Sequence, residues 1–278
     1  MERSTPDAAD LLDPSARPHR ARNVLQLVWF LTGRDLIVRY RGSVLGIFWS
    51  LVTPALTLAI YALVFGVLMG GRWGATATTP AEFTLLLFLG LIVFWLISES
   101  IAGAPRVIAG HPSYVKKVVF PLEVLPVIAV STATFHTAVR FLVFVLAYRL
   151  IEGNLHATVL WAPVILAPAV LLSLGLSWAL AAAGVFLRDL NEMIGVALTG
   201  LLFLSPVFYS ADRLPESLRW ALYLNPVTVP VEELRRVAIW GQRPDLDVMA
   251  VYALVCLGVA LSGRALFQRA RRGFADVL

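Results

Sequence analysis

Three ionisable side chains lie within the apolar segments of this sequence, where they could do chemistry. Glu99 lies in one apolar stretch. His136 and Arg140 lie in another, and their four-residue spacing places both side chains on one face of a helix. A carboxylate in such surroundings can carry a proton or a cation, or neutralise a neighbouring cation. Because a buried charge usually needs a partner, a Glu99–Arg140 ion pair is favoured over a direct role in coupled transport.

The motifs of common enzyme classes do not occur in the sequence. It has no GxxxxGK[ST] phosphate-binding loop, and its two lysines lie in YVKKVV, which has no glycine cradle. It has no HExxH or CxxC motif, and its four histidines are scattered over different regions. We therefore expect a chain that is not an enzyme, holds no cofactor and no metal, and needs a separate partner for any ATP hydrolysis.

The composition is typical of a protein with several membrane-spanning helices. Of its 278 residues, 59% are hydrophobic and 15% are charged, and the mean hydropathy is +0.78. A span needs about 20 largely apolar residues. The segments that meet this requirement lie at about 44–69, 83–104, 121–148, 158–186, 192–209 and 247–266. The sequence thus predicts an all-α polytopic membrane protein with six transmembrane helices.

The distribution of positive charge favours a membrane topology over a nucleic-acid surface. The formal net charge is +5, and the arginines cluster at the ends of the apolar runs. If the N-terminus is inside, more Lys and Arg fall on the cytoplasmic side than outside, as the positive-inside rule requires. We therefore expect both termini in the cytoplasm, contacts with membrane lipids and no binding of nucleic acid.

The chain before the first span divides into a tail and a helix. Residues 1–23 are polar and contain three prolines, so we expect a disordered cytoplasmic tail. Apolar side chains then recur on one helical face, at Val24, Leu27, Val28 and Leu31. This pattern predicts an amphipathic interfacial helix over 24–42. Gly42 and Gly46 would let the chain turn from that helix into the bilayer.

The connection between the fifth and sixth spans has two candidate helices of its own. It reads SADRLPESLRWALYLNPVTVPVEELRRVAIWGQRPDLD, with helical stretches at about 215–224 and 230–240 on either side of Asn225-Pro226. We expect a re-entrant helical hairpin at about 213–241 that dips toward the membrane and lines a cavity or pore mouth. A surface hairpin lying on the lipid headgroups is the alternative.

The cytoplasmic loop after the second span, PRVIAGHPSYVKKVVFPLEVLP, could contain a short helix. Between Pro112 and Pro121 there is room for about two turns at 1.5 Å per residue. We place this helix at about 111–118. It is either a connector that carries positive-inside lysines or a rigid peg that fits into a soluble partner.

Aromatic side chains are frequent in and near the predicted spans. Most aromatics of membrane proteins belong to interfacial belts or to helix packing. Sugar rings, however, present apolar C–H faces that stack on aromatic planes, so a set of aromatics could also line the path of a sliding glycan. The candidates for such a path are Trp49, Tyr61, Phe65, Trp95, Trp178, Phe208 and Tyr209.

Five blocks of the sequence, in one order, carry a resemblance to a known family. They are RDLIVRYRGSVLGIFWSLVTP, HPSYVKKVVFPLEVLP, FLRDLNEM, SPVFYSADRLPESLRWALYLNPVT and RRGFADVL. From about residue 24 to its end, the chain resembles the membrane-spanning (permease) subunit of ABC exporters for lipid-linked polysaccharide. The O-antigen exporter permeases are the most similar, and the teichoic-acid exporter permeases share much of the pattern.

The resemblance implies a homodimer in the bacterial inner membrane, bound to two copies of a separate ABC ATPase that holds ATP and Mg. The pair would enclose a channel for a polysaccharide whose lipid carrier is undecaprenyl diphosphate. Residues 43–267 would form the six-span permease domain, and residues 268–278 a cytoplasmic C-terminal tail.

The resemblance also implies three sets of functional residues. A gate helix at the cytoplasmic entrance would contain Arg34, Asp35, Arg39, Tyr40, Arg41 and Ser43. The coupling helix that docks on the ATPase would contain His111, Pro112, Ser113, Tyr114, Lys116 and Lys117. The hairpin would form an external gate that contains Pro215, Trp220, Asn225, Pro226, Glu232 and Arg235.

Other functions remain open at this point. A secondary transporter acting alone is disfavoured, because the spans contain few carboxylates. A membrane glycosyltransferase or polymerase is disfavoured, because the external loops lack a concentrated acidic site. A permease of a teichoic-acid, capsule or drug exporter differs from the favoured interpretation in its substrate.

Overall fold

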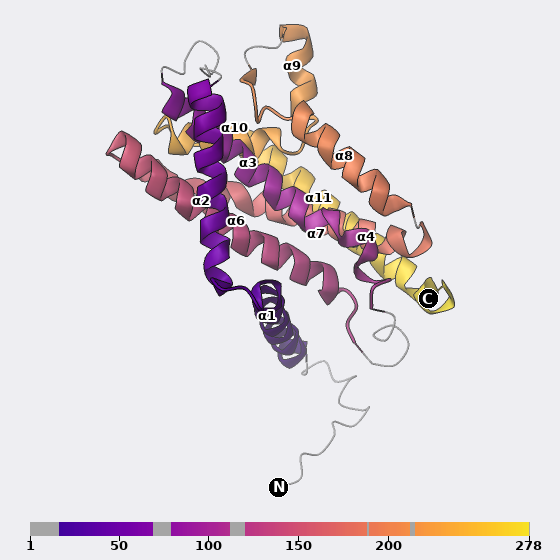
Figure 1. Cartoon of the computed structure of the whole chain (residues 1–278). Coiled ribbons are helices and arrows are strands. Elements are labelled where there is room, and N and C mark those ends of the chain that lie inside the picture. The colour runs from indigo at the N-terminus through magenta and orange to yellow at the C-terminus, as the bar shows by residue number, and fades with distance from the viewer. Residues whose placement is uncertain (1–16, 69–78, 112–119, 188, 212–214, 278) are drawn as a thin grey trace.

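Helices are the regular secondary structure of the part of the chain that its computed structural model describes (Figure 1), which comprises residues 17–68, 79–111, 120–187, 189–211 and 215–277. These ranges contain no strand, so the all-α prediction is confirmed. The longer helices are α1 (Arg17–Tyr40), α2 (Trp49–Tyr61), α3 (Pro80–Ala102), α6 (Val124–Glu152), α7 (Ala162–Phe186), α8 (Leu190–Leu204), α10 (Thr228–Ala238) and α11 (Leu246–Ala270). The short ones are α4 (Ala104–Val107), α9 (Glu216–Tyr223) and α12 (Phe274–Val277).

Five helical segments of the described chain are long and apolar enough to cross a membrane. They are Gly46–Phe65, Pro80–Val107, Val124–Glu152, Ala157–Phe186 and Leu246–Gly273. They coincide with five of the six predicted spans. The chain is therefore an integral membrane protein by the length and composition of its helices.

The fifth predicted span corresponds to α8, which is shorter than expected. Its 15 residues extend about 22 Å, less than the roughly 30 Å of a bilayer's hydrocarbon core. The predicted end at 209 is wrong, because the helix stops at Leu204. Ser205 has extended backbone (φ −85°, ψ 149°), the conformation that the following Pro206 favours. A sixth crossing by α8 stays a prediction.

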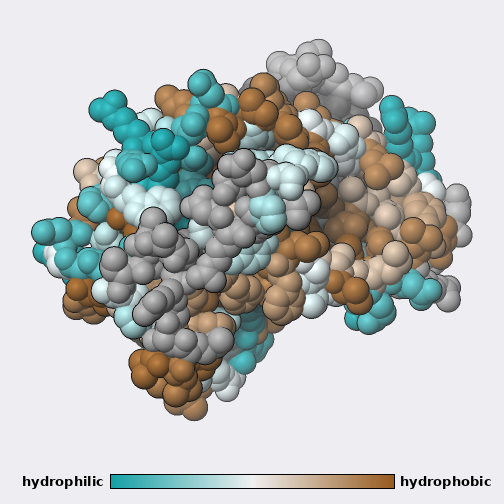
Figure 2. Space-filling view, turned by 90° about the horizontal axis from the view of Figure 1, so that it is seen from above, coloured by the Kyte–Doolittle hydropathy of each residue, from teal (hydrophilic) through white to brown (hydrophobic). Residues whose placement is uncertain are grey.

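Helix α3 forms the centre of the bundle, and α2 and α8 lie at its margin. In the most apolar stretch of the α3 span 78% of the residues are buried, against 6% in the span that contains α2. Helix α3 packs against α6, α7 and α10. Viewed from above, hydrophobic residues reach the surface beside hydrophilic ones (Figure 2).

Helices α7 and α11 pack at backbone contact. A Cβ atom added at Gly175 would lie 2.5 Å from the Val259 carbonyl oxygen and 2.6 Å from the Ala260 Cα. A Cβ atom at Gly263 would in turn overlap the Gly175 carbonyl oxygen. Glycines let transmembrane helices approach in this way, and α11 packs along α7 at this close distance.

Helix α1 begins at Arg17, earlier than the predicted start at residue 24. The four side chains of the predicted apolar face, Val24, Leu27, Val28 and Leu31, are half-buried, and α1 contacts α6. Leu25, Trp29 and Phe30 are exposed on other faces. The predicted turn after the helix is confirmed, because Gly42 and Gly46 have φ angles of 84° and 53°, which favour glycine. The position of α1 at a membrane interface stays a prediction.

The connection before α11 contains the two predicted helices, α9 and α10, with Asn225-Pro226 between them. Helix α10 is largely buried against α3, α7 and α11, whereas Trp220 on α9 is 64% exposed. Both helices lie at the upper end of the bundle in Figure 1, and α1 lies at the lower end. The depth of this hairpin in a membrane stays a prediction.

Candidate functional site

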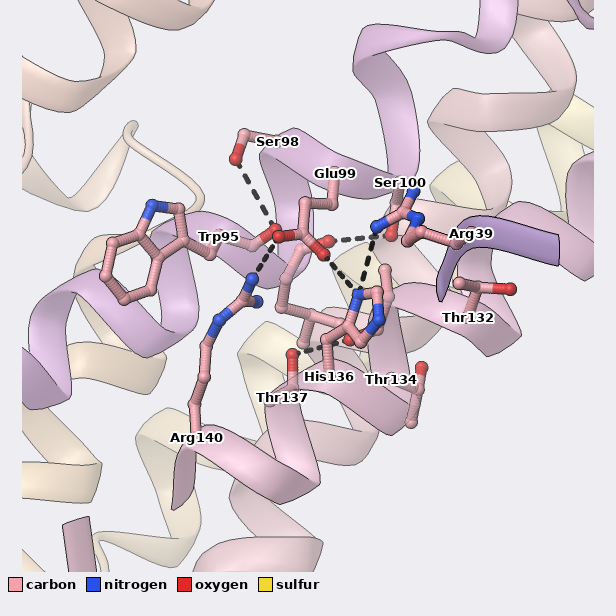
Figure 3. Close-up of polar contacts among 12 residues, drawn as sticks. Arg39, Trp95, Ser98, Glu99, Ser100, Thr132, Thr134, His136, Thr137 and Arg140 are labelled. Carbon is pink, nitrogen blue, oxygen red and sulfur yellow. Dashed lines mark hydrogen bonds and ion pairs between the residues drawn. The ribbon is translucent and has the colours of Figure 1, made fainter. Parts of the chain in front are cut away.

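A polar cluster joins α3 to α6 within the apolar bundle (Figure 3). Glu99 Oε1 accepts a hydrogen bond from Arg140, and Glu99 Oε2 lies 3.1 Å from Nδ1 of His136. The predicted Glu99–Arg140 ion pair is thus confirmed, and its side chains are 27% and 14% exposed. His136 and Arg140 contact the same carboxylate because their four-residue spacing puts both on one face of α6.

The end of α1 reaches this cluster from outside. The Tyr40 hydroxyl lies 3.3 Å from Nε2 of His136, and Arg39 Nη1 lies 3.4 Å from its Nδ1. A neutral imidazole has one donor and one acceptor nitrogen. The contact with the Glu99 carboxylate places a proton on Nδ1, so Nδ1 donates to Glu99 and has no lone pair left to accept a hydrogen bond from Arg39. His136 therefore links α1 to α3.

The Arg140 guanidinium lies over the indole of Trp95, with its Cζ 4.9 Å from the ring centroid. This cation–π contact covers one face of the indole. One terminal nitrogen of Arg140, Nη2, donates to Glu99. The other, Nη1, is buried and has no hydrogen-bond partner among the described residues.

A cavity of about 340 Å³ lies beside the cluster, between the end of α1 and helices α2, α3 and α6. It is lined by two arginines, two tryptophans, a carboxylate and several hydroxyls: Arg39, Tyr40, Trp49, Ser50, Thr53, Thr57, Trp95, Glu99 and Arg140. The fold thus brings Arg39 and Tyr40 of the predicted gate helix together with Trp49 and Trp95 of the predicted aromatic path.

A second cavity of about 370 Å³ shares Arg39 and Glu99 with the first and is also lined by Asp35. Asp35 Oδ2 accepts a hydrogen bond of 3.0 Å from the Thr132 hydroxyl. The two residues are 97 positions apart in the sequence, and no sequence pattern points to their contact. Of the other gate-helix candidates, Arg34 and Arg41 are exposed, and the Ser43 hydroxyl donates to the Tyr40 carbonyl at 2.8 Å.

The remaining aromatic candidates lie elsewhere. Phe65 is the centre of a second group, with ring centroids 5.8 Å from Tyr61 and 6.1 Å from Phe208. The Trp178 indole donates to the Glu123 carbonyl at 3.0 Å, and the Tyr209 hydroxyl donates to the Leu204 carbonyl at 3.1 Å. Which of these rings faces a translocation path stays a prediction.

Arg235 anchors the hairpin in the bundle. It is fully buried, and its guanidinium donates to the Leu86 carbonyl on α3 at 3.0 and 3.1 Å. It also donates to the carbonyls of Pro206, at 2.7 Å, and Val207, at 3.2 Å, just after the end of α8. Glu232 supplies its counter-charge at 3.0 Å.

Burial lowers the pKa of the Arg235 guanidinium to about 10, and Glu232 opposes that shift, so the group stays protonated at neutral pH. Gly90 on α3 makes room for it, because an added Cβ would lie 3.0 Å from Arg235 Nη2 and 3.2 Å from the Val207 Cα. Arg235 was an external-gate candidate from the sequence, but its carbonyl partners were not predicted.

The other hairpin candidates divide into buried and exposed residues. Asn225 donates to the Ser205 hydroxyl at 2.9 Å, and the Pro226 carbonyl accepts from the Tyr252 hydroxyl at 2.9 Å. Pro215 and Trp220 are exposed. The break between α9 and α10 is therefore held by hydrogen bonds to the end of α8 and to α11.

Most of the predicted coupling helix lies outside the described residues. This applies to Pro112, Ser113, Tyr114, Lys116 and Lys117. His111 is described, and its Nδ1 lies 3.0 Å from the Val107 carbonyl oxygen at the end of α4. The role of this loop stays a prediction.

Comparison with known proteins shows similarity over most of the chain. The family model described as "ABC-2 type transporter" matches residues 26–239. Two proteins from Klebsiella pneumoniae, each named O-antigen export system permease protein RfbA, are 24% and 25% identical over 257 and 261 residues. Each alignment covers 92% of this chain and 96% of the relative. A protein of the same name from Myxococcus xanthus is 29% identical over 253 residues, 88% of this chain and 93% of its own.

Proposed function

Because the chain belongs to the ABC-2 type transporter family, we propose that it is the channel-forming permease subunit of an ATP-driven exporter for polysaccharide of the O-antigen type. The observation that carries the proposal is the similarity to O-antigen export permeases over about nine-tenths of the chain. Membership of the family implies an ABC ATPase as partner. In this proposal the chain supplies the membrane path and the partner hydrolyses ATP.

The proposed substrate is a polysaccharide linked to undecaprenyl diphosphate, moved from the cytoplasm across the inner membrane. The termini would be cytoplasmic, and α1 with the following turn would form the cytoplasmic gate. The hairpin of α9 and α10 would form the external gate. The cavity beside Trp49 and Trp95 supports this assignment, because indole faces together with hydroxyl groups suit a glycan.

A homodimer is part of the proposal. Helix α8 has no buried residue, and few residues of α2 are buried, so the described residues of one chain do not cover their apolar faces. A second copy could cover them and enclose the path, and lipid would cover what remains. Two coupling helices, one from each copy, would then receive the motion of two ATPase subunits.

Disruption of the gene in its host tests this function. Surface polysaccharide and lipid-linked polymer inside the cell are measured in parallel, with a strain that carries the gene on a plasmid as control. We expect loss of the polymer outside and its accumulation inside, both reversed by the plasmid. Unchanged polysaccharide on both sides would rule out the glycan substrate and favour a drug exporter of the same family.

A further inference from the structure

The end of the chain packs back onto the bundle after α11. A 3₁₀ turn and α12 form the C-terminal segment Arg271–Val277, and α12 contacts α7. Among the side chains described in this segment, that of Phe274 alone is buried, with 0% of its surface exposed. Arg271, Arg272 and Val277 are exposed. One aromatic side chain therefore anchors the segment.

Phe274 packs between the ends of two long helices. Its ring lies edge-on to that of Phe267 on α11, with centroids 5.6 Å apart. On the other side, its centroid lies 6.1 Å from that of Phe186, the last residue of α7. Both distances are typical of favourable aromatic pairs. Phe274 thus joins the C-terminal segment to α7 and α11 at once.

The same cluster contains both flanks of the loop in which the coupling helix is predicted. Phe267 and Phe274 belong to one hydrophobic cluster with Ile108, Leu122 and Leu125. Ile108 precedes residues 112–119, which lie outside the described part of the chain, and the two leucines follow them. Figure 1 shows α4 and the C-terminus at the same end of the bundle. The C-terminal segment therefore completes the core on which the two flanks rest.

The flanks are also attached to α7, which fixes where the cluster lies. A Cβ atom added at Gly184 would overlap the Pro105 carbonyl oxygen, so α4 packs on α7 at backbone contact. After the loop, the Glu123 carbonyl accepts a hydrogen bond of 3.0 Å from the Trp178 indole. Helix α7 thus holds one side of each flank, and the C-terminal segment packs against the end of the same helix.

Three of the five sequence blocks that carry the family resemblance meet at this cluster. HPSYVKKVVFPLEVLP supplies Leu122 and Leu125, FLRDLNEM begins with Phe186, and RRGFADVL supplies Phe274. The blocks are far apart in the sequence, and the fold brings them to one end of the bundle. The last block is thereby given a place in the same structural unit as the loop.

We propose that the C-terminal segment holds the flanks of the loop in the orientation in which the loop contacts the ATPase, with Phe274 as the positioning residue. The contact with the ATPase rests on the proposed function, whereas the support of the flanks rests on the packing alone. A loop with displaced ends would absorb the motion of the ATPase instead of transmitting it.

Hydrogen exchange of the full chain in nanodiscs tests the support of the flanks. We expect Phe274→Ala to speed amide exchange about tenfold within 104–111 and 122–125, because loss of the ring opens the cluster locally. Exchange in α9 and α10, at the other end of the bundle, should not change. Val277→Ala is the matched control, since it shortens a side chain of the same segment that is 51% exposed. Unchanged exchange in both flanks would overturn the proposal, and so would faster exchange throughout the bundle.

Two further variants separate positioning from general loss of structure. Phe186→Ala removes a ring that packs on Phe274 but is itself 48% exposed, so the variant is expected to fold. We expect it to speed exchange in the same flanks. Phe274→Leu keeps an apolar side chain in the cluster and should restore most of the protection lost in Phe274→Ala. Loss of protection in Phe274→Leu equal to that in Phe274→Ala would contradict support by apolar packing.

The contact with the ATPase is tested in the assembled complex. We expect Phe274→Ala to lower the polysaccharide exported per ATP hydrolysed by about tenfold while hydrolysis continues, and Phe274→Leu and Val277→Ala to stay near the wild type. Normal export per ATP by a Phe274→Ala complex with loosened flanks would overturn the positioning role. The exchange experiment needs neither ATPase nor polysaccharide, so its outcome is separate from that of the gene disruption.

Discussion

At the scale of single residues, Glu99 accepts hydrogen bonds from His136 and Arg140 of α6. His136 also contacts the hydroxyl of Tyr40 on α1. The carboxylate is thereby occupied on both oxygens. This arrangement favours a structural role for Glu99, since a carboxylate already bonded to Arg140 is a poor carrier for a second cation. The cluster ties the predicted gate helix to the centre of the bundle.

We expect Arg140→Gln to destabilise the protein by about 2–4 kcal/mol, because it leaves the Glu99 carboxylate without its cation in a largely apolar bundle. The double variant Glu99→Gln/Arg140→Gln should lose less, since it removes both charges. Thermal unfolding of both variants and of Glu99→Gln, combined as a double-mutant cycle, measures the coupling. Additive effects of the two substitutions would contradict a functional ion pair.

At the scale of elements, the structure joins the hairpin and the end of α8 to α3 through one side chain. The segment after α8 is not helical, so the carbonyls of Pro206 and Val207 need donors from outside their own helix. Arg235 supplies them and holds α10 against α3 at the same time. Helices α7 and α11 are joined differently, by glycines that allow direct backbone contact.

Replacement of Arg235 should detach the hairpin from the bundle. We expect Arg235→Met to cost about 3 kcal/mol or more, because several buried carbonyls lose their donors. Arg235→Lys should rescue little of this, since an ammonium lacks the planar fork that reaches carbonyls on different elements. Limited proteolysis between α9 and α10 measures the detachment. Arg236→Met, at a side chain 39% exposed, is the control, and equal cleavage of both variants would contradict the prediction.

The contact between α7 and α11 predicts that alanine substitution will change the stability of the protein differently at two glycines. Gly175→Ala should destabilise the protein, because the new Cβ would meet backbone atoms of α11 at 2.5 and 2.6 Å. Gly258→Ala, on α11, should be neutral or slightly stabilising, because nothing lies within 4 Å of its added Cβ and alanine favours helix. Thermal unfolding in detergent compares them, and a stable Gly175→Ala would show that the helices can separate at little cost.

At the scale of the whole molecule, the bundle places the predicted gates at opposite ends. The α1 end and the α9 and α10 end are separated by the length of the bundle in Figure 1, and α3 is central between them. Trp95 and Glu99 of α3 line the cavity at the end of α1. The Leu86 carbonyl of the same helix accepts a hydrogen bond from Arg235. A displacement of α3 would therefore change both sites together.

Coupling to the ATPase is predicted to depend on the loop at 111–118. To change the ratio of two channel states from 1:99 to 99:1, a ligand must bind one state about 5.5 kcal/mol more tightly than the other. A rigid contact between the ATPase and the channel must transmit this free energy. We expect Tyr114→Ala and Lys116→Ala to reduce export while ATP hydrolysis by the assembled complex continues. Polysaccharide export and ATPase activity, measured side by side, check this, with Arg264→Ala as control. Normal export by both loop variants would contradict the coupling role.

The sequence by itself determined the features that depend on local patterns and on general requirements. Apolar length predicted five spans that the structure confirms, proline and periodicity predicted α9 and α10, and two glycines predicted the turn after α1. The Glu99–Arg140 pair was predictable because a buried charge needs a counter-charge. The five matching blocks predicted the family, which the family model confirms.

Only the tertiary structure decided which distant residues meet. The contacts of Tyr40 with His136 and of Arg235 with Leu86 join residues 96 and 149 positions apart, and no local period relates them. The end of α8 at Leu204 was missed because a long apolar run concealed the effect of Pro206. The cavity beside Arg39 also arises only from packing, since its lining comes from four helices whose relative positions depend on how their side chains fit together.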